Sequence, residues 1–218
     1  MIYYVHIPKT AGTSLQRLFT LNIDPTAIFL ANYDMQPGDL TFLIGSLELL
    51  YGHFPYGIDA RLNRPGIYLT CLRETAPRLI SSYFQHARDG WVGEKSIREY
   101  VETDKPKDMD NYSVRLLSGA GHEPPFGEIT KDHLRQACEN LRERFAAFGL
   151  YEHLPRSIRY FCDAADLDPV EVGYENVRPA GQTPEQIRAE DIAAVVRHNA
   201  LDDELYDYAR DEFLRRCR

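Results

Sequence analysis

A run of small and hydroxyl-bearing residues near the N-terminus, Lys9–Ser14, carries the first chemistry that the sequence shows. The apolar run Ile2–Val5 before it is typical of a short buried strand, and apolar residues recur at helical spacing from Leu15 to Phe19. A turn between a strand and a helix start presents backbone N–H groups at the positive end of the helix dipole. The lysine adds a full positive charge, and hydroxyl donors follow at Thr10, Thr13 and Ser14. We therefore expect this turn to bind a phosphate-like anion.

The turn does not have the spacing of the common nucleotide-binding loop, G-x-x-x-x-G-K-[ST], in which the lysine follows the last glycine. Here Lys9 comes three residues before Gly12, and no upstream glycine opens the loop. A kinase with an irregular loop, which would need Mg²⁺ and a γ-phosphate donor, stays an alternative.

An arginine and a serine eight residues apart form a second candidate anion site. The apolar run Ile67–Leu72 predicts a buried strand, Arg73 follows its last residue, and Ser81 lies on a helix that we expect to start at Pro77. A guanidinium group offers a bidentate fork for phosphate, and a serine hydroxyl can add a further hydrogen bond. Ligands of open α/β sheets bind at the carboxyl ends of the strands, so we expect this pair to lie near Lys9.

A histidine follows another predicted strand, which ends near Tyr51. The segment Gly52–Gly57, with the sequence Gly-His-Phe-Pro-Tyr-Gly, is a loop by its glycines and its proline. Group transfer to an alcohol needs a base that removes the hydroxyl proton, and the unperturbed pKa of histidine suits that role. We assign the role to His53, with His6 and Glu48 as the alternatives.

Three of these segments resemble motifs of sulfotransferases that use 3′-phosphoadenosine 5′-phosphosulfate (PAPS). The resemblance is closest to the carbohydrate 2-O-sulfotransferase-like branch and its small bacterial relatives. The run His6–Ser14 resembles the 5′-phosphosulfate-binding loop, Arg73 and Ser81 fall on the ligand positions of the R-x7-S motif for the 3′-phosphate, and Gly52–Gly57 resembles the loop that supplies a histidine base. The chain departs from the family directly after the arginine, where Glu-Thr replaces the frequent Asp-Pro.

The resemblance implies PAPS as the donor, 3′,5′-ADP as the product and no metal. It implies catalytic roles for Lys9 and His53, and it places the cofactor-binding residues at Lys9, Thr10, Ala11, Gly12, Thr13, Ser14, Arg73 and Ser81. The segment Asn111–Gly119 also resembles the family near the cofactor and acceptor cleft, so Arg115 is a candidate contact to the acceptor, with an i,i+4 hydrogen bond to Asn111 as the alternative role. Tyr56, an aromatic residue near a predicted loop, is a second candidate contact by stacking on a sugar or an adenine, with core packing as the alternative role. The expected acceptor is a small molecule or a carbohydrate, such as a sugar or a glycolipid. A non-catalytic nucleotide-binding module that keeps the pocket is the other alternative.

Strands that alternate with helices predict an α/β fold, with a parallel sheet flanked by helices in a single domain over residues 1–218. The resemblance adds the P-loop nucleotide-kinase-like sulfotransferase fold with a helical C-terminus. The remaining expected elements are helices over 108–118, from Thr130, and over 155–164, a strand over 146–150, and a helical C-terminus opened by a capping box at Thr183–Gln186 that runs to about Arg216.

Composition excludes several classes of protein. The 218 residues have a formal net charge of −8, which does not favour binding to nucleic acid or to a densely anionic polysaccharide. No apolar run approaches the roughly 18 residues that span a bilayer, and no signal peptide is visible. The four cysteines show no C-x-x-C spacing, which is typical of a reduced protein without a metal site. We therefore expect a cytoplasmic enzyme without a transmembrane segment.

Overall fold

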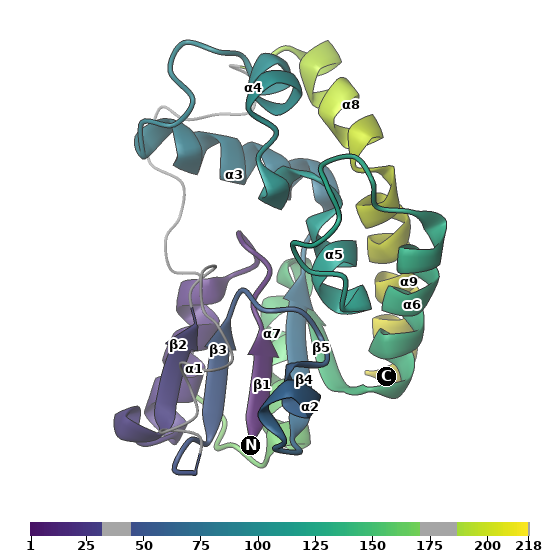
Figure 1. Cartoon of the computed structure of the whole chain (residues 1–218). Coiled ribbons are helices and arrows are strands. Elements are labelled where there is room, and N and C mark those ends of the chain that lie inside the picture. Colours follow the sequence, from purple (N-terminus) through teal and green to yellow (C-terminus); the bar gives the residue numbers. More distant parts are fainter. Residues whose placement is uncertain (32–44, 171–186, 218) are drawn as a thin grey trace.

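A five-stranded parallel sheet forms the centre of the described part of the chain (Figure 1). The computed structural model describes residues 1–31, 45–170 and 187–217. The strands run in the order β2-β3-β1-β4-β5, and every pairing between neighbours is parallel. Their bounds are β1 (Ile2–Val5), β2 (Ile28–Ala31), β3 (Leu49–Gly52), β4 (Ile67–Leu72) and β5 (Phe145–Leu150). Because the strands are parallel, the loops that follow them all leave from one edge of the sheet.

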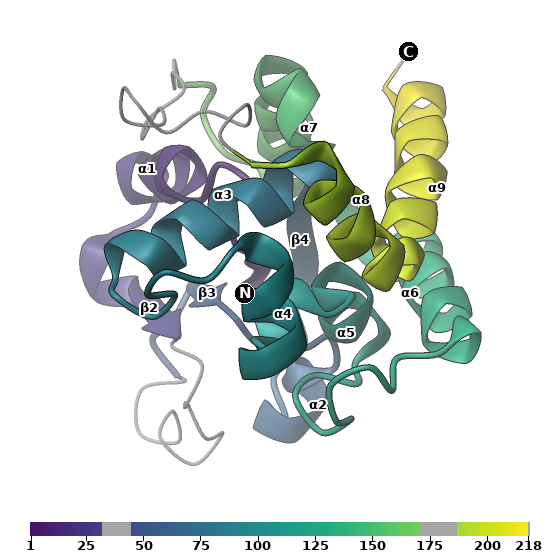
Figure 2. The ribbon, with the colours of Figure 1, turned by 90° about the horizontal axis from the view of Figure 1, so that it is seen from above.

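Helices cover both faces of the sheet and its carboxyl edge. One face packs against α1 (Gly12–Asn22) and α7 (Leu154–Ala165). The other face packs against α5 (Tyr112–Ser118), α6 (Lys131–Glu143) and α9 (Ala200–Arg216), with the short α2 (Ile58–Leu62) beside them. Three helices, α3 (Thr75–Arg88), α4 (Ile97–Asp104) and α8 (Ala189–His198), share a smaller core above the carboxyl edge (Figure 2). Short 3₁₀ turns lie at Pro25–Ala27, Lys107–Met109 and Tyr151–His153.

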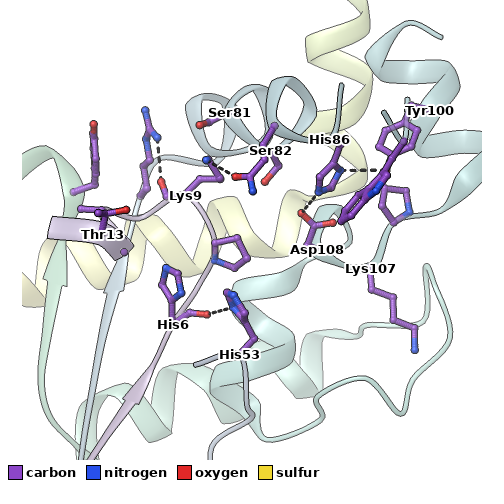
Figure 3. Close-up of a pocket in the computed structure, with 18 of the residues that line it drawn as sticks. His6, Lys9, Thr13, His53, Ser81, Ser82, His86, Tyr100, Lys107 and Asp108 are labelled. Carbon is purple, nitrogen blue, oxygen red and sulfur yellow. Dashed lines mark hydrogen bonds and ion pairs between the residues drawn. The ribbon is translucent and has the colours of Figure 1, made fainter. Parts of the chain in front are cut away.

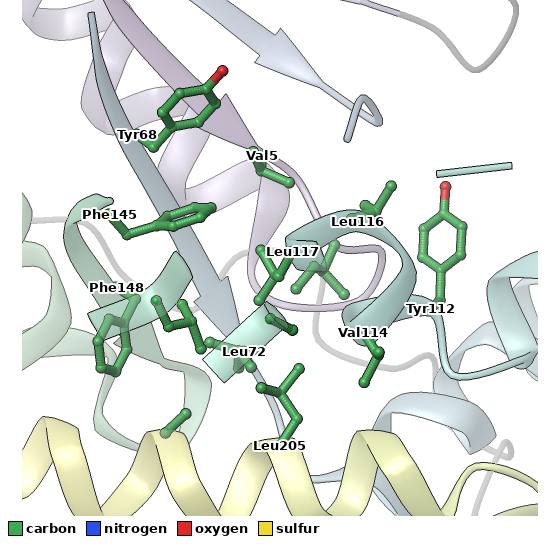
Figure 4. Close-up of a cluster of buried hydrophobic side chains, with 14 of the residues drawn as sticks. Val5, Tyr68, Leu72, Tyr112, Val114, Leu116, Leu117, Phe145, Phe148 and Leu205 are labelled. Carbon is green, nitrogen blue, oxygen red and sulfur yellow. The ribbon is translucent and has the colours of Figure 1, made fainter. Parts of the chain in front are cut away.

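The alternation of side chains along β1 explains how one strand supplies two cores. Tyr3 and Val5 point into the cluster on the α5, α6 and α9 side, while Ile2 and Tyr4 point into the cluster on the α1 and α7 side. All four residues are buried, as expected for a central strand of a sheet that is covered on both faces. Figure 4 shows the first cluster, in which Leu72 of β4 and Phe148 of β5 meet α5 and α9.

Most expected elements are present, with shifted bounds. Helix α3 starts two residues before Pro77, which therefore lies in its first turn, where backbone N–H groups have no helical partners and proline is tolerated. The helix expected over 108–118 is a 3₁₀ turn followed by α5, because Asn111 between them has a left-handed backbone with φ of 46°. Gly119 ends α5 with φ of 90°, as expected. The elements β5, α6 and α7 match their predictions within one residue.

The C-terminal part differs from a continuous helix. Asn199 separates α8 from α9, and its side-chain amide donates to the carbonyls of Met109 and Val195 while its oxygen accepts from the Asn111 N–H. A side chain that bonds the backbone of a neighbouring segment holds the chain at this corner. The capping box at Thr183–Gln186 lies outside the described residues. None of the helices in the described ranges is long and apolar enough to cross a membrane.

Candidate active site

A pocket of about 620 Å³ lies at the carboxyl edge of the sheet, between the loop after β1, helix α3 and the 3₁₀ turn Lys107–Met109 (Figure 3). Most of the residues that the sequence analysis assigns to the site line it, namely Lys9, Ala11, Gly12, Thr13, His53, Arg73 and Ser81. They come from the loop after β1 and the start of α1, from the loops after β3 and β4, and from α3. The parallel sheet therefore brings three segments that are far apart in the sequence to one pocket.

The loop after β1 has an unusual backbone that fixes its shape. Lys9 and Ala11 have left-handed conformations with φ of 67° and 65°, which cost free energy for residues other than glycine. The buried hydroxyl of Thr10 donates to the carbonyl of Ile7 at 2.7 Å and closes the turn. Strained residues of this kind persist only where surrounding contacts hold them, and they gather at ligand sites. The loop is therefore shaped before any anion binds.

Glycine is required at the start of α1 because the His6 ring packs closely against Gly12. A Cβ atom on Gly12 would lie 2.2 Å from Nε2 of His6, so any other residue would displace the histidine ring. The ring in turn stacks on His53 at 4.6 Å between centroids. His6 therefore lies directly between the anion loop and the candidate base. Burial, with smaller effects of the neighbouring His53 and Lys9, holds the pKa of His6 well below its usual range, so its ring is neutral.

Lys9 reaches across the pocket to α3, where its Nζ donates to Oε1 of Gln85 at 2.7 Å. Burial and the positive charges of Arg88 and Arg73 lower the pKa of Lys9. Positive charges gathered at a partly buried site favour an anionic ligand, because the ligand relieves the repulsion among them.

Arg73 joins the loop to the end of β4. Its Nη1 donates to the carbonyl of Lys9 at 3.0 Å, and its guanidinium group lies 4.1 Å from the ring centroid of Tyr151. Stacking on an aromatic ring fixes the plane of the guanidinium group, and its N–H groups then point outward in that plane, where they can donate hydrogen bonds. Ser81 lines the same pocket from the second turn of α3. Arg73 and Ser81, expected to hold the 3′-phosphate, thus line the same pocket as the Lys9 loop, which is expected to hold the 5′-phosphosulfate.

His53 is held by its Nδ1, which lies 2.7 Å from the carbonyl oxygen of His6. A carbonyl only accepts, so Nδ1 of the neutral ring is the N–H donor and the lone pair lies on Nε2. Burial lowers the pKa of His53, and the hydrogen bond to His6 and the negative charge of Asp108 partly offset this effect. The ring is therefore neutral near pH 7 and has an atom that can take a proton.

The structure places four other expected residues away from the pocket lining. Thr10 and Ser14 are buried in the wall behind the loop. Tyr56 packs on the rings of Tyr68 and Phe145, at 4.9 and 5.9 Å between centroids. Arg115 is fully buried.

The guanidinium group of Arg115 is used within the fold. It binds the Asp110 carboxylate and donates to the carbonyls of Gly121, Pro124 and Pro125. It also donates to the carbonyl of Asp110 at 2.9 Å. Arg115 therefore holds the Gly- and Pro-rich loop that follows α5, and neither it nor Tyr56 belongs to the pocket.

Of the two alternative bases, Glu48 is excluded by its position. It directly precedes β3, is exposed, and its backbone groups bond to Ala27 and Ile2 at the amino ends of the strands. The pocket lies at the opposite edge of the sheet. His6 does line the pocket, but its Nε2 faces Gly12 rather than open space.

Several lining residues are not part of any predicted motif. His86 of α3 lies with its Nε2 3.3 Å from Oδ2 of Asp108 and its Nδ1 3.1 Å from the hydroxyl of Tyr100 (Figure 3). Trp91 and Lys107 line the same side. These residues come from α3, α4, the segment between these two helices and the 3₁₀ turn, which meet only in the folded chain, so no local spacing brings them together. Within the described ranges, no group of three or more His, Cys, Asp or Glu side chains could hold a metal ion.

Two solved structures are similar to the chain. A solved mouse sulfotransferase, SULT7A1 complexed with PAP, is similar with 13% identity and a TM-score of 0.49 over 93% of this chain and 64% of that one. A solved sulfotransferase from Alicyclobacillus acidocaldarius is similar with 15% identity and a TM-score of 0.47, over 92% of this chain and 94% of that one. The chain thus spans somewhat less than two thirds of the mouse protein.

No curated protein sequence matches the chain. The model of the sulfotransferase family, by contrast, matches residues 1–209, which include every residue that lines the pocket. This match covers nearly the whole chain. The chain therefore belongs to the sulfotransferase family.

Proposed function

We propose that the chain transfers the sulfuryl group of PAPS to a hydroxyl group of an acceptor. The observation that carries the proposal is the meeting of the Lys9 loop, the Arg73 and Ser81 pair, and His53 at one pocket of a sulfotransferase-family chain. Two separate anion sites suit a donor with two phosphate groups, and a neutral histidine suits an acceptor that must lose a proton.

The residues present fit such a donor. The backbone N–H groups at the start of α1, together with Lys9 and Thr13, would hold the 5′-phosphosulfate, and Arg73 and Ser81 would hold the 3′-phosphate. The His6 ring packs against Gly12 where a side chain would otherwise lie. PAPS supplies the sulfuryl group and a phosphate leaving group when it is bound.

Lys9 would stabilise the negative charge that develops on the leaving oxygen. A fixed positive charge in a partly buried site acts without solvent reorganisation, and such groups supply a large share of catalysis. The bond from Lys9 to Gln85 holds the ammonium group over the loop. An anionic ligand would oppose the burial and the positive charges that lower the pKa of Lys9.

His53 would accept the proton of the acceptor hydroxyl on Nε2, while the Nδ1 bond to the carbonyl of His6 fixes the tautomer and the direction of the ring. The resemblance of the loop Gly52–Gly57 to the 2-O-sulfotransferase-like branch supports a carbohydrate or glycolipid acceptor. The size of the pocket, about 620 Å³, suits a nucleotide and a small acceptor group together.

A panel of nucleotides tests the proposal without knowledge of the acceptor. We expect 3′,5′-ADP to raise the melting temperature of the protein more than ATP with Mg²⁺ or AMP at equal concentration, because a tighter ligand stabilises the folded state by mass action. A kinase would respond most to ATP with Mg²⁺. Transfer of labelled sulfate from PAPS to a panel of sugars and alcohols would then separate an active enzyme from a non-catalytic module.

A further inference from the structure

Among the described residues, Asp108 is the only carboxylate that lines the pocket. It stands across the pocket from Lys9 and His53, and its negative charge acts on the pKa of both (Figure 3). Its side chain is 12% exposed, so a ligand in the pocket can reach it. A carboxylate repels the anionic donor, so its place here is not explained by donor binding. The remaining partner in the pocket is the acceptor.

The carboxylate is held in a fixed position. The guanidinium group of Arg78 donates to the backbone carbonyl of Asp108 at 2.9 Å, and Arg78 is itself buried in an ion pair with Asp202 at 2.9 Å. Oδ2 lies 3.3 Å from Nε2 of His86, and Nδ1 of the same ring lies 3.1 Å from the hydroxyl of Tyr100. In the described part of the chain, no side chain or backbone group donates to Oδ1. One oxygen is thus anchored and the other is available to a ligand.

A flat apolar surface lies beside this carboxylate. The side chain of Trp91 is 62% exposed although it lines the pocket, and its ring lies 5.0 Å from the ring of His86. A large exposed aromatic ring at a pocket offers contact area to the apolar face of a ligand, and a few fixed polar groups set the orientation. Trp91 and Asp108 together suit a ring with a C–H face and a hydrogen-bond donor at its edge.

We propose that Asp108 and Trp91 form the acceptor-binding subsite and select a hydroxyl-bearing acceptor that is uncharged or cationic over one that carries a carboxylate. The proposal rests on the proposed function, since the reacting hydroxyl must lie at His53. In the reaction an S–O bond to the acceptor forms, the S–O bond to the leaving phosphate breaks, and the proton passes to Nε2 of His53. Asp108 takes no proton in this step and instead accepts a hydrogen bond from a neighbouring hydroxyl or ammonium group.

The single tryptophan of the chain makes the subsite directly observable, because all tryptophan fluorescence comes from Trp91. The protein saturated with 3′,5′-ADP is titrated with methyl glucoside, methyl glucosaminide and methyl glucuronide. We expect the first two to change the emission at concentrations about tenfold or more below those of the glucuronide, because a buried like-charge contact is costly.

The variant Asp108→Asn should weaken binding of the first two glycosides by about tenfold, the effect of losing a charge-assisted hydrogen bond, and should reduce the discrimination against the glucuronide. It should bind 3′,5′-ADP as tightly as the wild type or more tightly, because a negative charge has been removed. The matched control is Asp104→Asn, an aspartate of α4 that pairs with Lys95 outside the pocket and should change neither property.

Tighter binding of the glucuronide, no emission change with any of the three glycosides, or an unchanged pattern in Asp108→Asn would overturn the subsite. If Asp108→Asn does not fold, the order of the affinities of the wild type for the three glycosides still tests the subsite. Calorimetry with 3′,5′-ADP separates the two claims. A protein that binds this nucleotide but shows none of the expected glycoside pattern contradicts the subsite alone, whereas a protein that does not bind it contradicts the proposed function.

Discussion

The two walls of the pocket are built in different ways. The proposed donor wall consists of strand–turn–helix segments in which the residues that we expect to bind the donor lie within about ten positions of one another, as with Lys9 to Thr13 and Arg73 to Ser81. The proposed acceptor wall is assembled from α3, α4, the segment between them that carries Trp91, and a 3₁₀ turn, and its members, such as His86 and Asp108, meet only through tertiary packing. Local geometry suits a constant ligand, whereas a wall made of separate segments can change from one protein to the next without loss of the donor site.

The largest effect on the transfer rate is expected for His53, which we propose lies between the donor and the acceptor. His53→Ala should lower the rate of sulfate transfer by roughly 10²–10⁴, the usual contribution of a positioned general base, and leave 3′,5′-ADP affinity near that of the wild type. Because burial lowers the pKa of His53, the wild-type kcat/KM should fall on the acid side at a pH below about 6.5, and this limb should vanish in the variant. His153→Ala, an exposed histidine outside the pocket, is the control. Undiminished transfer by His53→Ala would move the role to His6.

The buried ion pair of Arg78 and Asp202 allows a test of whether the positions of α3 and of Asp108 depend on the same contact. Arg78 holds the backbone of Asp108 and pairs with Asp202, which accepts from the backbone N–H groups of Ser113 and Val114. Arg78→Ala would leave the carboxylate of Asp202 buried without its ion pair, which typically costs about 3–5 kcal/mol. Chemical denaturation should show this loss in the free energy of unfolding. A loss below about 1 kcal/mol would show that α3 does not depend on the pair.

The variant Lys9→Ala tests whether Lys9 acts mainly in the transition state or mainly in donor binding. It should lower transfer by roughly 10²–10³, as the loss of one group that stabilises transition-state charge does, and weaken 3′,5′-ADP binding much less. Steady-state rates and calorimetry give the two numbers. Lys131→Ala, an exposed lysine paired with Glu204, serves as the control. An equal fall in binding and turnover would make Lys9 a ligand of the ground state only.

The same division explains what the sequence could predict. The strands β1 and β4 and the helices after them follow from local apolar patterns, so the sequence predicts the donor residues at one edge of a parallel sheet, and all of them except Thr10 and Ser14 line the pocket there. Asp108 and Tyr100 gave no signal, because their contacts with His86 depend on the packing of α3 against α4.

Two further expectations could not be decided from residues that are close in the sequence. Arg115 was expected at the acceptor, yet its guanidinium group binds the Asp110 carboxylate and donates to carbonyls of the loop that follows α5. Glu48 was weighed as a base, although it precedes its strand and so belongs to the opposite edge. Gln85, by contrast, lies four residues after Ser81 on the same helix, and this spacing alone would place both at one pocket.

The smallest expected effect gives the most direct test, because it needs no acceptor. Calorimetry should compare 3′,5′-ADP with 5′-ADP on the wild type, on Arg73→Ala and on the control Arg98→Ala, an exposed arginine of α4. The loss of a charge-assisted contact costs about 1.5–3 kcal/mol, so the wild type and the control should prefer 3′,5′-ADP by roughly tenfold to a hundredfold. In Arg73→Ala this preference should largely disappear, even if damage to the Lys9 loop weakens both nucleotides. Equal affinity of the wild type for the two nucleotides would contradict the donor site.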